Sequence, residues 1–172
     1  MATGAYMKVI GKNQGAISDR AFSAESVGST IFQEAHQDCI YVLASSMEVA
    51  VPTDPQSGQP TGVRGHKPFT ITKYFDRASP LLWQAACTGE VLEISLSFYR
   101  TSARGGLEQY YSIKFTDAVI VDMKGYFQNI LMDEFKGLGH HEDVSFVYRA
   151  VEWTHEMAGT TGSDDWRRPT YS

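Results

Sequence analysis

The sequence predicts a mainly β fold of the antiparallel barrel or sandwich type. Runs with a two-residue apolar period recur at short spacing, most clearly over Val91–Arg100. Glycines mark a turn between that run and the next one, Tyr110–Thr116, so the two are expected to form a β-hairpin. Only Pro80–Cys87 has clear helix start and stop signals. Many short strands with a single helix are typical of antiparallel barrels and sandwiches.

The strand signals rest on which side chains share a face. In Val91–Arg100 the alternating apolar residues are Leu92, Ile94, Leu96 and Phe98, which predicts one buried face. Further strands are predicted at Tyr6–Ile10, Cys39–Val49, Thr70–Tyr74, Ala118–Lys124 and Val144–Trp153. The last of these carries apolar residues on both faces, so neither face is expected to be fully solvated.

The predicted helix has recognisable ends. Ser79 can cap it, Pro80 suits its first position, and Gly89 lies just past its last residue. A further helical turn is predicted within Asn129–Phe135.

The segment Val51–Phe69 is predicted to be a long loop between two strands. Its prolines and glycines are expected to break any regular ladder: Pro52, Pro55, Gly58, Pro60, Gly62 and Gly65. Loops longer than about 12–15 residues are uncommon unless they are functional or disordered. Disorder is one interpretation. An ordered arm that docks on another surface, such as a second copy of the chain, is favoured, because prolines reduce the entropy lost on ordering and Arg64, His66, Lys67 and Phe69 are anchoring residue types.

Composition limits the classes of function. A chain of 172 residues with 12% aromatic residues is expected to form one domain over 1–172. Its net charge is −5 and its cations are scattered, with Arg167-Arg168 as the one tight basic pair. Nucleic-acid binding depends on clustered cations, so the sequence predicts no nucleic-acid partner.

The expected location follows from what the N-terminal region lacks. No signal-peptide pattern is visible, and no apolar run is long enough to span a membrane. We therefore expect synthesis and folding in the cytoplasm, no membrane insertion, and any export to use a route without a cleavable leader. Cys39 and Cys87 match no metal spacing and are predicted to be two buried free thiols.

Residues with catalytic or metal-binding chemistry occur, but without a supporting pattern. The run His140-His141-Glu142-Asp143 has metal-ligand residue types. Adjacent side chains on an extended chain point in opposite directions, so a solvated turn is favoured over a metal site. His66 could be a catalytic base, yet no nucleophile motif accompanies it, and an orienting hydrogen bond at an interface is favoured.

The remaining polar candidates have simpler interpretations. His155 is interpreted as structural, and Asp164-Asp165 as a solvated pair in a polar tail. Neither GxxxxGK[ST] nor GxGxxG occurs, so no phosphate-binding loop is predicted. The sequence predicts no enzyme, no cofactor and no metal site.

The long loop also carries a family resemblance. Its matching residues are Pro52-Thr53-Asp54, Ser57-Gly58, Thr61-Gly62, Arg64, His66 and Pro68-Phe69. They resemble the extended loop of the Hcp (haemolysin-coregulated protein) family, the tube subunit of the bacterial type VI secretion system. Further matches follow in family order at 11–17, 72–73, 76, 79–85, 88–90, 98–100 and 163–166. Segments 18–36 and 118–144 match the family less well, which leaves the first connection between strands and the local structure of 125–139 open.

The resemblance implies a fold and a mechanical function. The expected fold is a small two-sheet β-barrel with one short α-helix and a long extended loop, as in phage tail tubes, followed by a C-terminal tail at 157–172. Six subunits would form a ring, and rings would stack into a tube that a sheath propels out of the cell. The implied partners are other copies of the chain, the type VI spike and sheath, and effector proteins carried or chaperoned in the pore.

By the same resemblance, the extended loop at 51–69 would form the subunit interface. Its predicted interface residues are Pro52, Thr53, Asp54, Gly58, Thr61, Gly62, Arg64, His66, Pro68 and Phe69. Asp54, Arg64 and His66 would be polar fasteners, and Pro52, Pro68 and Phe69 would fix the path of the chain and its apolar anchorage. Glu93, Ser95 and Ser97 are candidates for the pore surface, equal to other polar strand faces.

Two other classes of function stay open at this stage. A monomeric β-barrel carrier of small ligands would use the 51–69 loop as a lid and would contain an apolar internal cavity. An enzyme, with His66 or His141 as the acting residue, is the third interpretation.

Overall fold

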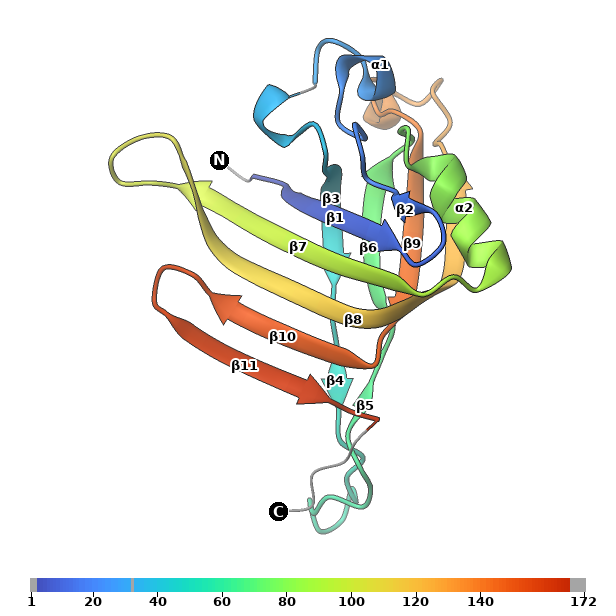
Figure 1. Cartoon of the computed structure of the whole chain (residues 1–172). Helices are drawn as coiled ribbons and strands as arrows, with labels where there is room; N and C mark the ends of the chain where they lie inside the picture. The colour runs from blue at the N-terminus through green and yellow to red at the C-terminus, as the bar shows by residue number, and fades with distance from the viewer. Residues whose placement is uncertain (1–2, 32, 168–172) are drawn as a thin grey trace.

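The structure, a computed structural model, describes residues 3–31 and 33–167 and is dominated by antiparallel strands that curl around one core (Figure 1). In chain order the strands are β1 Ala5–Gly11, β2 Gly15–Ala16, β3 Ile40–Ser46, β4 Val49–Ala50, β5 Gly65–His66, β6 Phe69–Tyr74, β7 Leu92–Thr101, β8 Leu107–Tyr126, β9 His141–Val147, β10 Ala150–His155 and β11 Thr160–Asp165. The helices are α1 Ala24–Val27 and α2 Ser79–Thr88, with 3₁₀ turns at Glu34–His36 and Asp133–Phe135. The predicted mainly β fold is confirmed.

Strand pairing closes the sheet into a ring. Neighbouring strands follow the order β11-β10-β8-β7-β1-β3-β6-β9, and β8 also pairs with β9. The strands β7, β1, β3, β6, β9 and β8 therefore enclose the core, while the β10–β11 hairpin continues the sheet outside the ring (Figure 1). Every one of these pairings is antiparallel.

A single bent strand replaces the two strands predicted at Tyr110–Thr116 and Ala118–Lys124. Strand β8 runs for 20 residues from Leu107 to Tyr126. Its first half pairs with β10, and its second half with β9. The bend coincides with Asp117, whose φ of 51° lies in the left-handed region that Asp tolerates better than most residues. The prediction of two strands was wrong because a bend within one strand gives the same sequence signal as a boundary between two strands.

Two predicted strands are each divided in the structure. The segment Val144–Trp153 is split between β9, which pairs with β6 and β8, and β10, which pairs with β8 and β11. The chain changes partners at Tyr148 and Arg149, and the Arg149 N–H donates to the Thr116 carbonyl at 3.1 Å. The segment Cys39–Val49 is likewise split into β3 and the first residue of β4.

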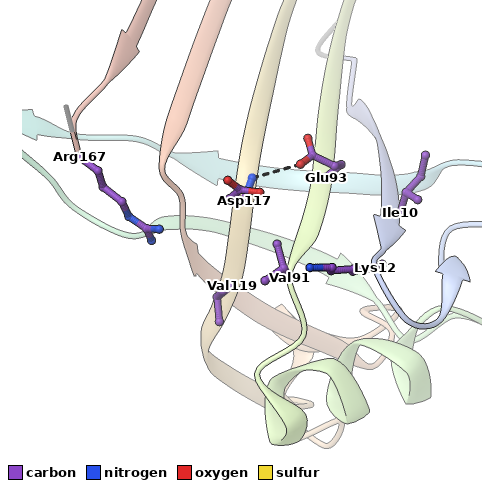
Figure 2. A pocket seen from close by; sticks show the side chains of 8 residues that line it. Ile10, Lys12, Val91, Glu93, Asp117, Val119 and Arg167 are labelled. Carbon is purple, nitrogen blue, oxygen red and sulfur yellow. Dashed lines mark hydrogen bonds between the residues drawn. The ribbon is translucent and has the colours of Figure 1, made fainter.

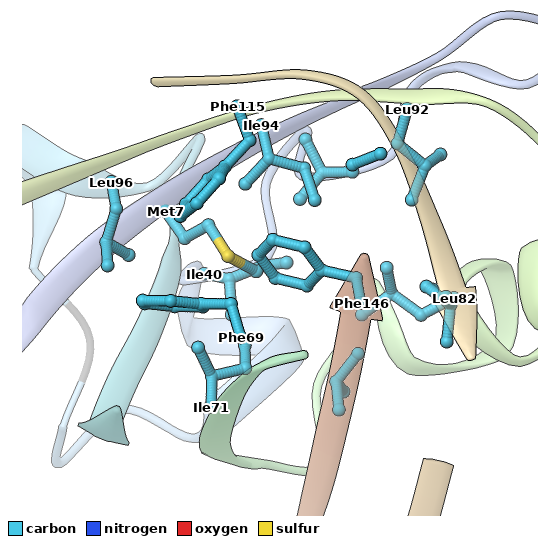
Figure 3. Packing of buried hydrophobic residues seen from close by; sticks show 14 of the residues in the cluster. Met7, Ile40, Phe69, Ile71, Leu82, Leu92, Ile94, Leu96, Phe115 and Phe146 are labelled. Carbon is cyan, nitrogen blue, oxygen red and sulfur yellow. The ribbon is translucent and has the colours of Figure 1, made fainter. Parts of the chain in front are cut away.

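Aliphatic side chains packed around a group of phenylalanine rings fill the interior of the ring of strands (Figure 3). Phe69 lies 4.9 Å from Phe115 and 5.3 Å from Phe146, measured between ring centroids, and all three are at most 1% exposed. The alternation predicted for β7 is confirmed, because Leu92 and Leu96 are fully buried within this core. Side chains thus occupy the space where a carrier would hold its ligand.

Helix α2 lies against the ring and begins one residue earlier than predicted. Its N-cap is Ala78, so the prediction that Ser79 caps the helix was wrong. The Asp76 carboxylate accepts the Ala78 N–H at 2.9 Å, and the Ser79 hydroxyl accepts the Asp76 N–H at 3.0 Å. Pro80 lies in the first turn, and Gly89 ends the helix with a left-handed φ of 67°, both as predicted.

A buried charged cluster ties α2 to the sheet. Lys73 of β6 and Glu142 of β9 are both 0% exposed, and the Lys73 ammonium donates to the Glu142 carboxylate. The same ammonium lies 3.0 Å from the Asp76 carboxylate, and the Trp83 indole N–H donates to Glu142 at 3.0 Å. Burial raises the pKa of Asp76 even though the Lys73 charge opposes this shift.

The cluster corrects the interpretation of His140–Asp143 as a solvated turn. His141 opens β9, and Glu142 is one of the most buried residues of the chain. Only His140 lies in the exposed loop before the strand. Glutamate is rarely buried unless it is paired, so the residue types suggested an exposed turn. The partner of Glu142 is Lys73, 69 positions away, which the local sequence does not reveal.

Other local predictions have mixed outcomes. Cys39 is buried as predicted, but Cys87 is exposed on α2. Only Asp133–Phe135 of the turn predicted within Asn129–Phe135 is helical, as one 3₁₀ turn. Across the described residues, no helix combines the length and apolar character needed to cross a bilayer.

We expect Lys73→Met to lower the free energy of unfolding by about 3–5 kcal/mol, because it leaves two buried carboxylates without their cation. Chemical denaturation at neutral pH measures this change. Lys136→Met is the control, since Lys136 forms only an exposed pair with Asp133, and it should leave stability unchanged. Similar stabilities for the two variants would contradict a structural role for the cluster.

We expect Phe146→Ala to lower the free energy of unfolding by about 3–5 kcal/mol through loss of transfer energy and creation of a cavity. Phe127→Ala removes the same side chain from a site that is 63% exposed and should have little effect. Denaturation midpoints of the two variants test the placement of the core. A larger loss at Phe127 would show that the core is misassigned.

Candidate subunit interface

Residues 49–66 form a narrow hairpin, here called the arm, that projects from the ring of strands (Figure 1). At its base Val49 pairs with His66 and Ala50 with Gly65, and farther out Thr53 forms an isolated bridge with Pro60. The Thr61 N–H also donates to the Pro52 carbonyl at 2.8 Å. The prediction that prolines and glycines break any regular ladder is confirmed, because only an isolated bridge forms beyond the two pairs at the base.

Asp54 orders the tip of the arm. Its carboxylate accepts the Gln56 N–H at 3.0 Å and the Ser57 hydroxyl at 2.8 Å. The Asp54 carbonyl accepts the Gly58 N–H at 2.8 Å, and Gly58 has a φ of 70°, which favours glycine. The hydrogen bond from Gln56, followed by that from Ser57, lowers the pKa of the Asp54 carboxyl. The side chain predicted as a polar fastener thus closes the turn of its own arm.

The sides of the arm expose apolar side chains. Val49 is 44%, Val51 47% and Val63 62% exposed. Gly62 allows the two sides to approach closely, since a Cβ at that position would lie 3.3 Å from Pro52 Cγ. An ordered hairpin with apolar flanks is suited to docking on another surface.

The base of the arm is held by four side chains, here called the clamp: Arg64, His66, Tyr148 and Asp164. Arg64 Nε and Nη2 each donate to one Asp164 oxygen at 2.7 Å. His66 Nε2 lies 2.7 Å from Asp164 Oδ2, and His66 Nδ1 lies 2.8 Å from the Tyr148 hydroxyl. The clamp joins β5, the β9–β10 junction and β11.

The charges in the clamp define its hydrogen bonds. The Arg64 hydrogen bond, with a further contribution from His66, lowers the pKa of Asp164, which therefore stays ionised and can only accept. His66 Nε2 consequently carries a proton. Burial raises the pKa of Tyr148 to about 12, so its hydroxyl remains protonated where it lies 2.8 Å from His66 Nδ1. The ring of His66 stacks on Trp166 at 5.5 Å between centroids.

The clamp corrects two predictions for the C-terminal part. Asp164 and Asp165 are not a solvated pair, because Asp164 binds Arg64 and His66 while Asp165 pairs with Arg149. Part of the predicted tail at 157–172 is strand β11, Thr160–Asp165, and residues 168–172 lie outside the described residues. The run Thr160–Asp165 has no apolar alternation, so only pairing with β10 makes it a strand.

The structure separates the predicted interface residues into three groups. Six of them form the hairpin: Pro52, Thr53, Asp54, Gly58, Thr61 and Gly62. Arg64 and His66 belong to the clamp. Pro68 is exposed just before β6, whereas Phe69 is 1% exposed in the subunit's own core. Sequence reasoning missed Tyr148 and Asp164, and a carboxylate 100 positions from Arg64 gives no local signal of pairing.

A surface hollow of about 510 Å³ lies along β1, β7 and the bend of β8 (Figure 2). Cations and carboxylates both line it: Lys12, Arg167, Glu93 and Asp117. The Asp117 carboxylate accepts a hydrogen bond from Arg149 at 2.7 Å, and the Asp117 backbone N–H donates to the Glu93 carboxylate at 3.3 Å. No group of three or more potential metal ligands occurs within residues 3–31 and 33–167.

Residues 6–155 match the family model described as "Type VI secretion system effector, Hcp". The chain belongs to the Hcp family. It is 52% identical over 170 residues to the "Major exported protein" of Pseudomonas aeruginosa, covering 98% of both chains. Hcp proteins are structural and secreted, and the family is not one of enzymes. Membership identifies the chain as a type VI secretion tube protein.

Solved structures support the same fold. A structure described as "Crystal structure of Hcp protein" superimposes with a TM-score of 0.93 at 38% identity, covering 98% of this chain and 100% of the other. The "Secreted protein Hcp3 from Pseudomonas aeruginosa" has a TM-score of 0.81 at 45% identity, covering 97% of this chain and 100% of the other. The predicted Hcp resemblance is therefore confirmed.

We expect the clamp to make stability depend on acid pH. The pKa of Asp164 is lowered in the folded state, so its contribution is present above the ordinary value of 3.8 and is lost as pH falls through the folded pKa. The free energy of unfolding should fall more steeply between about pH 5 and about pH 2 in the wild type than in Asp164→Asn. Denaturant titrations across that range measure both slopes. Parallel slopes would show that Asp164 has an ordinary pKa in the fold.

Proposed function

We propose that this protein forms hexameric rings that stack into the inner tube of a type VI secretion system, and that the tube carries effector proteins in its pore. The projecting, internally ordered arm is the observation that carries this proposal, together with membership of the Hcp family. The function is mechanical, and it requires no turnover chemistry.

The shape of the subunit supports assembly from identical copies. An arm that leaves the body at one end makes a heterologous contact when it docks on a different surface of the next copy. Such contacts close into rings when the rotation fits and otherwise propagate along an axis. Rings that stack combine both outcomes, which is the geometry of a tube.

The arm would be the connecting element, with its residues in distinct roles. The hairpin residues Pro52, Thr53, Asp54, Gly58, Thr61 and Gly62 shape the arm, and the exposed Val51 and Val63 supply apolar contact area. Arg64 and His66 would act at its base, and Pro68 and Phe69 would join it to the barrel.

The proposed partners and location follow from the proposed tube. The protein would be made in the cytoplasm, assemble with the spike and sheath of the apparatus, and leave the cell when the sheath contracts. The similar Pseudomonas aeruginosa protein is named for export, which supports this route. A small-ligand carrier gains no support, since apolar side chains fill the interior (Figure 3).

The native mass of purified protein tests the proposal. A ring should have about six times the subunit mass of 19.1 kDa by light scattering, and electron microscopy should show annular particles. A monomer at every accessible concentration would contradict it.

We expect Val63→Asp to prevent ring formation while leaving the fold intact, because it places a charge on the apolar flank of the arm without touching the core. Leu107→Asp introduces the same charge at the β7–β8 turn, where Leu107 is 49% exposed and remote from the arm (Figure 1). Light scattering compares the assembled fractions, and thermal denaturation checks the fold. Equal assembly of both variants would exclude the arm flank from the interface.

A further inference from the structure

We infer that Asp164 positions the arm for assembly: its single carboxylate holds both Arg64 and His66, so the C-terminal hairpin β10–β11 determines where the arm points. This inference rests on the proposed function and adds to it. Arg64 and His66 would then promote assembly from within their own subunit, in contrast to the prediction that they fasten onto a neighbour.

The geometry of the contact restricts direction as well as distance. Two parallel N–H···O bonds at 2.7 Å fix the plane of the Arg64 guanidinium relative to the Asp164 carboxylate. His66, two residues farther along the arm, adds a bond at 2.7 Å to the same carboxylate. Two points of attachment on one side of a hairpin oppose both bending and twisting at its base.

Shielding from water strengthens the clamp. The His66 side chain is 2% exposed, and those of Arg64 and Asp164 are 23% and 22% exposed. Trp166 stacks on one side of the His66 ring, and its indole N–H donates to the Tyr148 carbonyl. Charges that are partly removed from water are screened less by salt than fully exposed pairs.

Strand β11 is itself braced against the barrel. Arg149 donates to the Asp117 carboxylate at 2.7 Å and to the carboxylate of Asp165, the neighbour of Asp164. Asp117 lies at the bend of β8, so the brace connects β11 to the strand that closes the ring. The arm is therefore held in a fixed direction relative to the ring of strands.

Both oxygens of Asp164 are occupied within the chain. Oδ1 accepts from Arg64 Nη2, and Oδ2 accepts from Arg64 Nε and lies against His66 Nε2. The Nε and Nη2 donors of Arg64 therefore bind a residue of its own subunit. Any effect of Arg64 on assembly should then depend on Asp164, and a double-mutant cycle can measure this dependence.

The test measures ring dissociation constants for the wild type, Arg64→Ala, Asp164→Ala and the double variant. We expect each single change to weaken assembly on the order of tenfold, and the double variant to be little weaker than the worse single one, as coupled residues behave. Arg100→Ala, which removes the distant Arg100–Glu108 surface pair, is the control and should assemble normally. Additive losses would show that Arg64 contacts a neighbour and would overturn the inference while leaving the proposed function standing.

Hydrogen exchange on the same variants gives a readout that needs no ring. In Asp164→Ala and in the milder Asp164→Asn, amides of the arm such as Asp54, Gly58 and Thr61 should exchange faster, while amides of β7 keep their protection. Unchanged exchange in the arm would overturn the clamp as a positioning device. If the wild type forms no ring yet the arm loosens in these variants, the clamp stands and the proposed tube function fails.

Discussion

The structure depends on one strand that serves two parts of the sheet. The first half of β8 pairs with β7 and β10, and beyond the bend at Asp117 its second half pairs with β9. This double use closes the ring of strands around the apolar core and leaves β10–β11 attached outside it. The core, the buried cluster and the base of the arm all take their positions from this closure.

Two sets of charged side chains act as internal connections in this fold. Lys73 and Glu142 join two strands beneath α2, where a charge without its partner would be costly. Arg64 and Asp164 join the arm to the C-terminal hairpin at a less buried site. The Lys73–Glu142 pair stabilises the ring of strands, and the Arg64–Asp164 pair holds the arm that projects from it.

Much of the fold could be predicted because its signals are local. The alternation in β7 depends on neighbouring residues that share one face, and Gly89 ends α2 through its own backbone freedom. The arm was recognised from its prolines and glycines and from its order of motifs. The clamp could not be predicted, since Asp164 and Tyr148 are far along the chain from His66 and have no pattern of their own.

The sequence by itself determined the β class, the ends of the helix, the place of the arm and the Hcp family, because periodicity, turn residues and motif order are properties of short segments. Only the tertiary structure decided that β8 is continuous through Asp117, that Glu142 is buried and that the run ending in Asp165 is a strand. Each of these depends on partners distant in sequence, whose proximity exists only after the ring of strands has closed.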